Sequence, residues 1–204
     1  MSPSEFDDRA KTWDEDAAKV ERARAVAAEM REAIPLSREM RAMEYGCGTG
    51  LLSFELYHEL GQIILADTSE GMLEVLRGKI AAAGAGNMQA VRLDLAEEAP
   101  LPEQFDLIYS LMVLHHIDDT QRILHGFHES LRAQGILCIC DLDREDGSFH
   151  DGPFHGHPGF DRGELDEMVR EARFEAVQFT TAHEIFRHGR SYPLFLMTAR
   201  RAGA

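Results

Sequence analysis

The stretch Ala42-Met43-Glu44-Tyr45-Gly46-Cys47-Gly48-Thr49-Gly50 decides how this chain folds. It starts apolar, reaches an acidic residue, and then places glycine at every second position. A second apolar run over 63–66 ends in Asp67. Strand, glycine turn, helix, strand and acid, in this order, are typical of α/β proteins that hold a nucleoside-like cofactor. The glycines let the backbone approach the ligand, and the acid can accept hydrogen bonds from ribose hydroxyls.

Strand and helix patterns alternate along the rest of the chain. Apolar runs predict strands over 41–46, 62–67, 88–93, 105–110, 136–140, about 175–182 and about 193–200. Helical periodicity and capping residues predict helices over 14–34, 50–60, 69–83, from an N-cap at Asp118 to about Gly135, and after an N-cap at Asp161. This order predicts an α/β fold, with a doubly wound, mostly parallel sheet and helices on both faces. We expect a single domain over 1–204, with an N-terminal helical cap over 1–40.

Composition narrows the class of protein and its partners. The chain has 204 residues, 44% of them hydrophobic, and a formal net charge of -15. A surface this acidic repels phosphate backbones, so we expect no nucleic-acid partner. The N-terminus lacks the pattern of a signal peptide, and no apolar run reaches the ~20 residues that span a membrane. With three cysteines in apolar or glycine-rich segments, we expect reduced thiols and a cytoplasmic protein. No pattern specifies an oligomeric state.

The glycine spacing separates two kinds of cofactor. A dinucleotide fingerprint reads G-x-G-x-x-G, whereas here the third glycine comes one place early and Leu51 stands where that fingerprint has glycine. The spacing therefore disfavours a pyrophosphate seated on the helix start. A nicotinamide-dependent oxidoreductase remains the least favoured interpretation.

The chain resembles class I S-adenosylmethionine-dependent methyltransferases, in the small-molecule, ubiquinone-biosynthesis-like group (types 11 and 12). The resemblance rests on Glu44-x-Gly-x-Gly-x-Gly with Asp67, and on the segments 6–14, 91–95, 105–117 and 131–137. In the last of these, Ala133 and Gln134 replace a usual proline and glycine. The resemblance implies a Rossmann-like, seven-stranded sheet with an antiparallel last strand. It also implies methyl transfer from S-adenosylmethionine to a small-molecule acceptor.

The same resemblance implies where the cofactor binds. Glu44 is expected near the methionine amino group, and Asp67 at the ribose hydroxyls. Further contacts are expected from the turn residues Gly46, Cys47, Gly48 and Gly50, from Thr68, Met72, Asp94 and Leu95 around the adenine, and from Ser110 at the methionine part. Trp13, the single tryptophan, is either a core anchor or a lid over the sulfonium, since an aromatic face attracts a cation.

The sequence indicates less clearly which residues contact the acceptor. His115 and His116 follow the fourth strand, and a histidine there can take a proton or simply hold the loop. We single out His116 and Asp141 as the candidates for a catalytic role. The polar segment 141–160 is the candidate acceptor-side loop; its histidines and aspartates show no diagnostic metal spacing, so no metal is expected. A non-catalytic module that binds S-adenosylmethionine is the alternative function.

Overall fold

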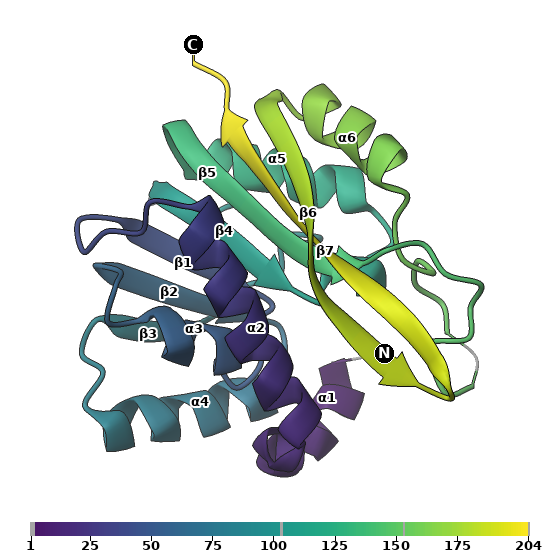
Figure 1. Cartoon of the computed structure of the whole chain (residues 1–204). Helices are drawn as coiled ribbons and strands as arrows, with labels where there is room; N and C mark the ends of the chain where they lie inside the picture. Colours follow the sequence, from purple (N-terminus) through teal and green to yellow (C-terminus); the bar gives the residue numbers. More distant parts are fainter. Residues whose placement is uncertain (1–2, 103, 153, 204) are drawn as a thin grey trace.

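A seven-stranded sheet forms the centre of the computed structural model, which describes residues 3–102, 104–152 and 154–203. The strands are β1 (Arg41–Tyr45), β2 (Gln62–Asp67), β3 (Met88–Arg92), β4 (Phe105–Leu111), β5 (Leu131–Leu142), β6 (Phe174–Arg187) and β7 (Arg190–Arg201). Their order is β3-β2-β1-β4-β5-β7-β6, and β7 runs antiparallel to both of its neighbours (Figure 1). The predicted fold class, with its antiparallel last strand, is confirmed.

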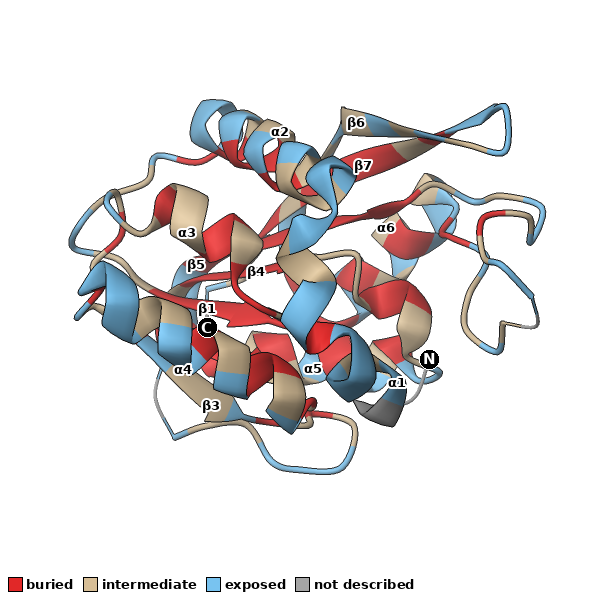
Figure 2. Ribbon diagram, turned by 90° about the horizontal axis from the view of Figure 1, so that it is seen from below, coloured by how far each residue is buried: buried red, intermediate tan, exposed pale blue. Residues whose placement is uncertain are grey.

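Helices cover both faces of this sheet. They are α1 (Pro3–Arg9), η1 (Ala10–Glu15), α2 (Ala17–Ala33), α3 (Leu51–Leu56), α4 (Glu70–Ala83), η2 (Leu114–His116), α5 (Thr120–Ser130) and α6 (Arg162–Glu171). One apolar cluster joins α2, α3 and α4 to the sheet, and a second joins α5 and α6 to the opposite face. Because side chains alternate along a strand, Ala42 enters the first cluster and Met43 the second. Figure 2 shows the buried sheet between helices with exposed outer faces.

Several helix boundaries differ from the sequence expectation. The first long helix begins at Ala17 rather than at 14, because the Asp16 side chain caps it by accepting from the Ala18 N–H. The α5 helix is capped by Asp119 instead of Asp118, and it ends at Ser130. It stops there because Leu131 already pairs with β4 and is extended.

The last two strands are longer than expected and form a projecting hairpin. Their turn is His188-Gly189, with φ of 52° and 73°, the two positive values that a tight two-residue hairpin needs. β5 pairs with β7 only from Leu194 onward, so the outer hairpin pairs only with itself. Figures 1 and 2 show it extending beyond the rest of the sheet.

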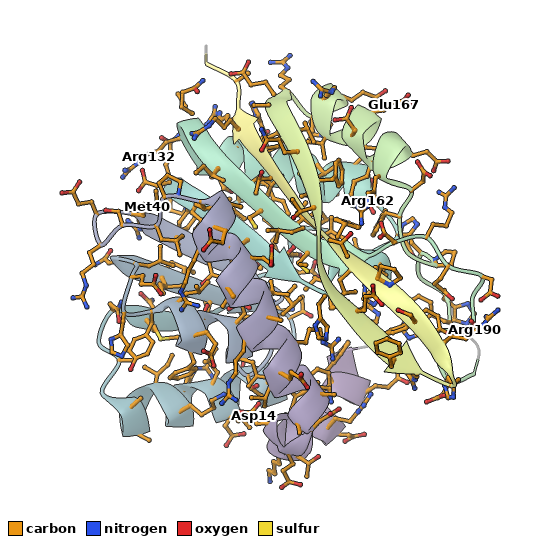
Figure 3. The ribbon with its side chains drawn as sticks, viewed as in Figure 1. Asp14, Met40, Arg132, Arg162, Glu167 and Arg190 are labelled. Carbon is orange, nitrogen blue, oxygen red and sulfur yellow. The ribbon has the colours of Figure 1, made fainter. Side chains whose placement is uncertain are left out.

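The segment between β5 and α6 is tied down at both ends. Arg162 donates two hydrogen bonds of 2.7 Å to the carboxylate of Asp143 at the start of the segment. Nearer the hairpin, Arg190 contacts Asp146 at 2.7 Å (Figure 3 labels both arginines). The segment is therefore held against the hairpin. None of the helices in the described part of the chain has the length and apolar character needed to cross a membrane.

Candidate active site

A cavity of about 900 Å³ opens at the carboxyl ends of the parallel strands. Its walls come from the N-terminal helices, the glycine turn, the ends of β2 and β3, the η2 turn, the 143–160 segment and the hairpin. Open α/β sheets bind ligands at this edge, where the strand order reverses between β1 and β4. The predicted site residues on its walls are Trp13, Glu44, Gly46, Cys47, Gly48, Asp67, Thr68, Met72, Asp94 and His116.

The glycines of the turn serve different purposes. A Cβ added at Gly48 would meet only Trp13 Nε1 at 3.9 Å and Met72 Sδ at 4.0 Å, so the backbone here borders open space that a ligand can fill. Gly50 has a φ of 79° at the start of α3, and a Cβ there would lie 2.7 Å from Leu76 Cδ1. Gly50 therefore belongs to the turn and the core, and it does not line the cavity.

Asp67 connects the end of β2 to the glycine turn. One carboxylate oxygen accepts a hydrogen bond from the Gly48 N–H at 2.7 Å, and the other accepts from the Ser69 N–H at 2.9 Å. Burial raises the pKa of Asp67 above its ordinary value, although these N–H groups oppose that shift. A carboxylate has about four acceptor sites, so capacity remains for two ligand hydroxyls on the cavity side.

Glu44 lies at the cavity floor in a buried polar network. Its side chain accepts a hydrogen bond from the Ser53 hydroxyl, which lies 2.5 Å from Tyr109 Oη. Glu44 is 2% exposed, and burial raises the pKa of its carboxyl to about 8. The carboxyl is therefore mostly protonated at neutral pH, and a cation placed beside it would favour the carboxylate.

Arg22 brings a positive charge from α2 into the same cavity. Among the described residues its guanidinium forms no hydrogen bond or ion pair, and burial lowers its pKa. A desolvated, unpaired guanidinium is suited to a carboxylate or phosphate group. The sequence patterns did not single out Arg22. Its position next to Ala23 and near Val26, on the buried face of α2, is the feature that could have indicated a buried arginine.

Of three further residues expected beside the cofactor, Asp94 lines the cavity, whereas Leu95 and Ser110 are buried in the core. Asp94 lines the cavity and accepts from the Ala96 N–H at 3.0 Å. Leu95 does not line it: its N–H donates to Tyr45 Oη at 3.2 Å, and its side chain is 3% exposed. Ser110 also lies behind the wall, 2% exposed, and its hydroxyl has no hydrogen-bond partner among the described residues.

The N-terminal helices are latched over the glycine turn. The carboxylate of Asp7 accepts from Ser69 Oγ at 2.6 Å and from the Gly71 N–H at 2.8 Å. Asp14, labelled in Figure 3, accepts from Thr49 Oγ1 and pairs with Lys79 Nζ, both at 2.5 Å. These contacts join α1 to the start of α4, and η1 to the glycine turn and to Lys79 farther along α4.

Trp13 lies between these two latches, on the cavity wall. It is half-buried, and Lys19 Nζ lies 4.0 Å from the centroid of its ring. Arg9 Cζ also lies over the ring, 5.4 Å from its centroid. A ring already paired with two cations still presents an apolar wall to the cavity, so both of the expected roles of Trp13 are compatible with its position.

His115 and Asp141 form a buried pair on the other side of the cavity. His115 Nδ1 lies 2.6 Å from an Asp141 oxygen, and the His115 N–H donates to the second oxygen at 3.3 Å. Burial opposes ionisation of Asp141, but the contacts with His115 and with the Leu142 N–H outweigh it and lower its pKa. Asp141 is 0% exposed and does not line the cavity, whereas His115 does. Asp141 therefore cannot touch a substrate and is suited only to hold His115.

Two further imidazoles pack around His115. The His116 ring lies 4.0 Å from it and the His150 ring 5.4 Å, and His150 stacks on Phe154 at 3.6 Å. Burial, with the neighbouring His115, lowers the pKa of His116 to about 3 and that of His150 to about 4. Across the described ranges, no group of three or more His, Cys, Asp or Glu residues is arranged to hold a metal ion.

Comparison with known proteins gives a family. The family described as "methyltransferase domain" matches residues 36–186. A ubiquinone/menaquinone biosynthesis C-methyltransferase UbiE from Proteus mirabilis is 28% identical over 183 residues, covering 73% of this chain and 72% of the relative. A ubiquinone biosynthesis O-methyltransferase from Ruegeria pomeroyi is 32% identical, covering 54% of this chain and 44% of the relative. The chain thus spans less than half the length of several curated relatives.

Solved structures show the same fold at low identity. A methyltransferase from Haloferax volcanii, described as putative and solved in complex with the Trm112 methyltransferase activator, superposes with a TM-score of 0.80 at 14% identity. The match covers 97% of this chain and 98% of that one. A SAM-dependent methyltransferase from Aquifex aeolicus superposes with a TM-score of 0.71 at 16% identity, covering 99% and 100%.

Proposed function

Because this chain belongs to the methyltransferase domain family, we propose that it transfers a methyl group from S-adenosylmethionine to a small-molecule acceptor. The observation that carries the proposal is the set of charged groups around one cavity. Glu44, Arg22 and Asp67 provide an acid, a free guanidinium and a ribose-type carboxylate, in walls that otherwise pack tightly. This set matches the charges and hydroxyls of the cofactor.

The residues would divide the cofactor between them. Glu44 would face the ammonium of the methionine tail and Arg22 its carboxylate, since each supplies the opposite charge in a desolvated place. Asp67 would accept from the ribose hydroxyls, while Gly48 leaves room for the ligand beside the turn. Asp94 would lie at the adenine. Leu95, Gly50 and Ser110 support these walls from behind.

We assign proton removal to His115. When bound, S-adenosylmethionine would supply a sulfonium methyl group for an acceptor oxygen to bond, and the thioether would leave with the electron pair of the broken carbon–sulfur bond. Asp141 fixes the Nδ1–H tautomer of His115, which leaves Nε2 to take the hydroxyl proton. His116 then contacts the acceptor without acting as the base, because its pKa is about 3.

We base the proposed acceptor class and cellular location on the net charge and on the state of the cysteines. The net charge of -15 supports a small-molecule acceptor over nucleic acid, and the reduced, buried thiols support a cytoplasmic location. Within the domain we propose that 1–40 forms a helical cap and that 141–160 faces the acceptor.

The proposal is tested by calorimetric titration with S-adenosylhomocysteine and, in parallel, with NADH. We expect micromolar binding of the first and none of the second. Binding of NADH alone would overturn the proposal. If S-adenosylhomocysteine binds but no member of a broad acceptor panel turns over, the alternative of a non-catalytic S-adenosylmethionine-binding module is favoured.

A further inference from the structure

A buried tyrosine on the central strand faces the acid of the cofactor site. Tyr109 of β4 is in register with Glu44 of β1, and partners in register on parallel strands point to the same side of the sheet. Helix α3 adds Ser53, whose hydroxyl donates to Glu44 Oε2 and lies 2.5 Å from Tyr109 Oη. Ser53 and Tyr109 are both 0% exposed. The three side chains therefore form one chain of hydrogen bonds inside the protein.

The direction of this chain follows from the protons available to it. A carboxylate can only accept, so Ser53 uses its single hydroxyl proton on ionised Glu44. Tyr109 then donates to Ser53, and this is the one hydrogen bond that its hydroxyl makes within the described residues. Hydrogen bonds to an ionised acceptor are about twice as strong as those between neutral groups, and each bond polarises the next. The Tyr109 hydroxyl therefore stabilises the carboxylate without touching it.

Resting on the function proposed above, we propose that Tyr109 is a positioning residue for the cofactor, which acts through Ser53 to hold the Glu44 carboxylate where the ammonium of the methionine tail binds. Glu44 lines the cavity, whereas Tyr109 lies behind it. Burial opposes ionisation of Glu44, and its contacts with Ser53 favour the charged form. The ammonium thus needs a carboxylate that burial disfavours, and the two hydroxyls offset part of that penalty.

The titratable groups Asp67, Lys79 and Cys47 also face Glu44. Asp67 raises the pKa of Glu44, and Lys79 lowers it. Cys47 is a neutral thiol, because burial raises its pKa well above the usual range. Replacing Tyr109 by phenylalanine alters none of these three groups, and the ammonium of the ligand is the same in every measurement. A change in the pH at which Glu44 ionises therefore reports the Tyr109 hydroxyl.

The test is calorimetric titration with S-adenosylhomocysteine at about pH 6.5 and about pH 9, on either side of the Glu44 pKa of about 8. Tyr109→Phe removes one oxygen and keeps the ring, so the core stays filled. Without this donor Glu44 should ionise about half a pH unit higher, which makes binding about threefold weaker than in the wild type at the lower pH. At the higher pH the two affinities should agree within about twofold, because Glu44 is largely ionised in both proteins.

Ser53→Ala breaks the same chain at its middle, and it keeps the backbone N–H that also favours the Glu44 carboxylate. Loss of the direct bond should raise the pKa of Glu44 by about one unit, so binding should be about tenfold weaker at the lower pH and within about twofold at the higher pH. A double variant links the effect to the acid. In Glu44→Gln, which has no carboxylate to stabilise, adding Tyr109→Phe should change the affinity by less than about twofold at either pH.

The chain offers a matched control in Tyr192. This residue is 4% exposed, and its hydroxyl lies 2.8 Å from Ser148 Oγ, but it does not line the cavity. Tyr192→Phe should leave the affinity unchanged at both pH values. The inference is overturned if Tyr109→Phe binds as tightly as the wild type at the lower pH, or if it is weakened equally at both. Failure of the wild-type protein to bind S-adenosylhomocysteine at any pH would instead count against the proposed function, so the two failures are distinguishable.

Discussion

The two halves of the cavity are built in different ways. The cofactor half centres on one nearly continuous piece of chain, the turn 46–50 and the end of β2, to which α2 adds Arg22 and the end of β3 adds Asp94. Its key carboxylate at Asp67 is already bonded to two backbone N–H groups. The acceptor half is assembled from η2, the 143–160 segment and the hairpin, and there His116 Nδ1 and His150 Nε2 have no hydrogen-bond partner among the described residues. Apart from Arg22, the charged groups of the first half are already hydrogen-bonded before its ligand arrives, whereas the second half leaves more of its polar groups unpaired among the described residues.

Because of this difference, substitutions in the two halves should affect cofactor binding and methyl transfer separately. Substitutions in the cofactor half should change affinity for S-adenosylhomocysteine, because that half only binds. Substitutions in the acceptor half should change turnover or acceptor affinity and leave cofactor affinity intact.

The largest effect is expected at the His115–Asp141 pair. His115→Gln removes the base and should lower kcat for an accepted hydroxyl compound by about 10²- to 10⁴-fold. Asp141→Asn should also lower kcat, since it no longer holds the Nδ1–H tautomer. Steady-state kinetics gives both values, and calorimetry should show S-adenosylhomocysteine affinity within twofold of the wild type. His125→Gln, at an exposed position on the outer face of α5, is the control. If both variants retain full kcat, the acceptor needs no base and this half only positions it.

Asp67→Ala should have the second largest effect. It leaves two ribose hydroxyls without their charged acceptor, a loss of about 1.5–3 kcal/mol, or roughly tenfold to a hundredfold in affinity for S-adenosylhomocysteine. The loss of contacts to the Gly48 and Ser69 N–H groups adds to it. Asp166→Ala, on the outer side of α6, is the matched control. Unchanged affinity in a folded Asp67→Ala protein would contradict the assignment of the cofactor half.

The same contrast explains what the sequence could predict. The family, its cofactor S-adenosylmethionine and the mostly parallel α/β sheet were predictable, because the glycine turn and Asp67 are consecutive motifs whose spacing reflects local geometry. That Leu95 and Gly50 face the core was not, since a motif gives a position along the chain and not the direction of a side chain. Arg22 was missed because its role depends on α2 packing against β6 and β7, contacts that are distant in sequence.

The ring stacking of His150 on Phe154 could not be predicted from the sequence either. Both residues lie in a polar segment with no periodicity, and their ring stacking depends on how that segment folds against η2. The lengths of the two hairpin strands, β6 and β7, were underestimated for a related reason. Its turn residue His188 has a positive φ, which histidine adopts far less readily than glycine, so the strands read as shorter than they are.

Glu44 should make cofactor binding depend on pH. With a pKa of about 8 in the free protein, its carboxyl is protonated at pH 7, and the ammonium of the ligand favours the carboxylate. Binding therefore releases a proton, so affinity for S-adenosylhomocysteine should rise as pH increases, by up to about tenfold per unit, and level off above about pH 8.

Glu44→Gln is the matching variant. It cannot ionise, so the affinity should lose this pH dependence and fall about tenfold at pH 8. Calorimetry in two buffers with different ionisation enthalpies measures the released proton directly. A wild-type protein that releases no proton at pH 7 would show that Glu44 stays neutral in the complex, and the ammonium would need another partner.

The smallest effect is expected at the latch between the cap and the cofactor half. Asp14 pairs with Lys79 while both side chains are about one-third exposed, so the pair is only partly screened by solvent. Asp14→Asn should weaken closure of the cap and raise the dissociation rate of S-adenosylhomocysteine about threefold. Trp13, the single tryptophan, lies in the cap beside Gly48, so its fluorescence in stopped flow reports the rate.

Glu70→Gln breaks a comparable ion pair on the exposed side of α4 and should leave the rate unchanged. Equal rates in the wild type and Asp14→Asn would mean that the cofactor leaves without opening the cap. Its exit would then run through the acceptor half, on the side of the cavity lined by His115, His116 and His150.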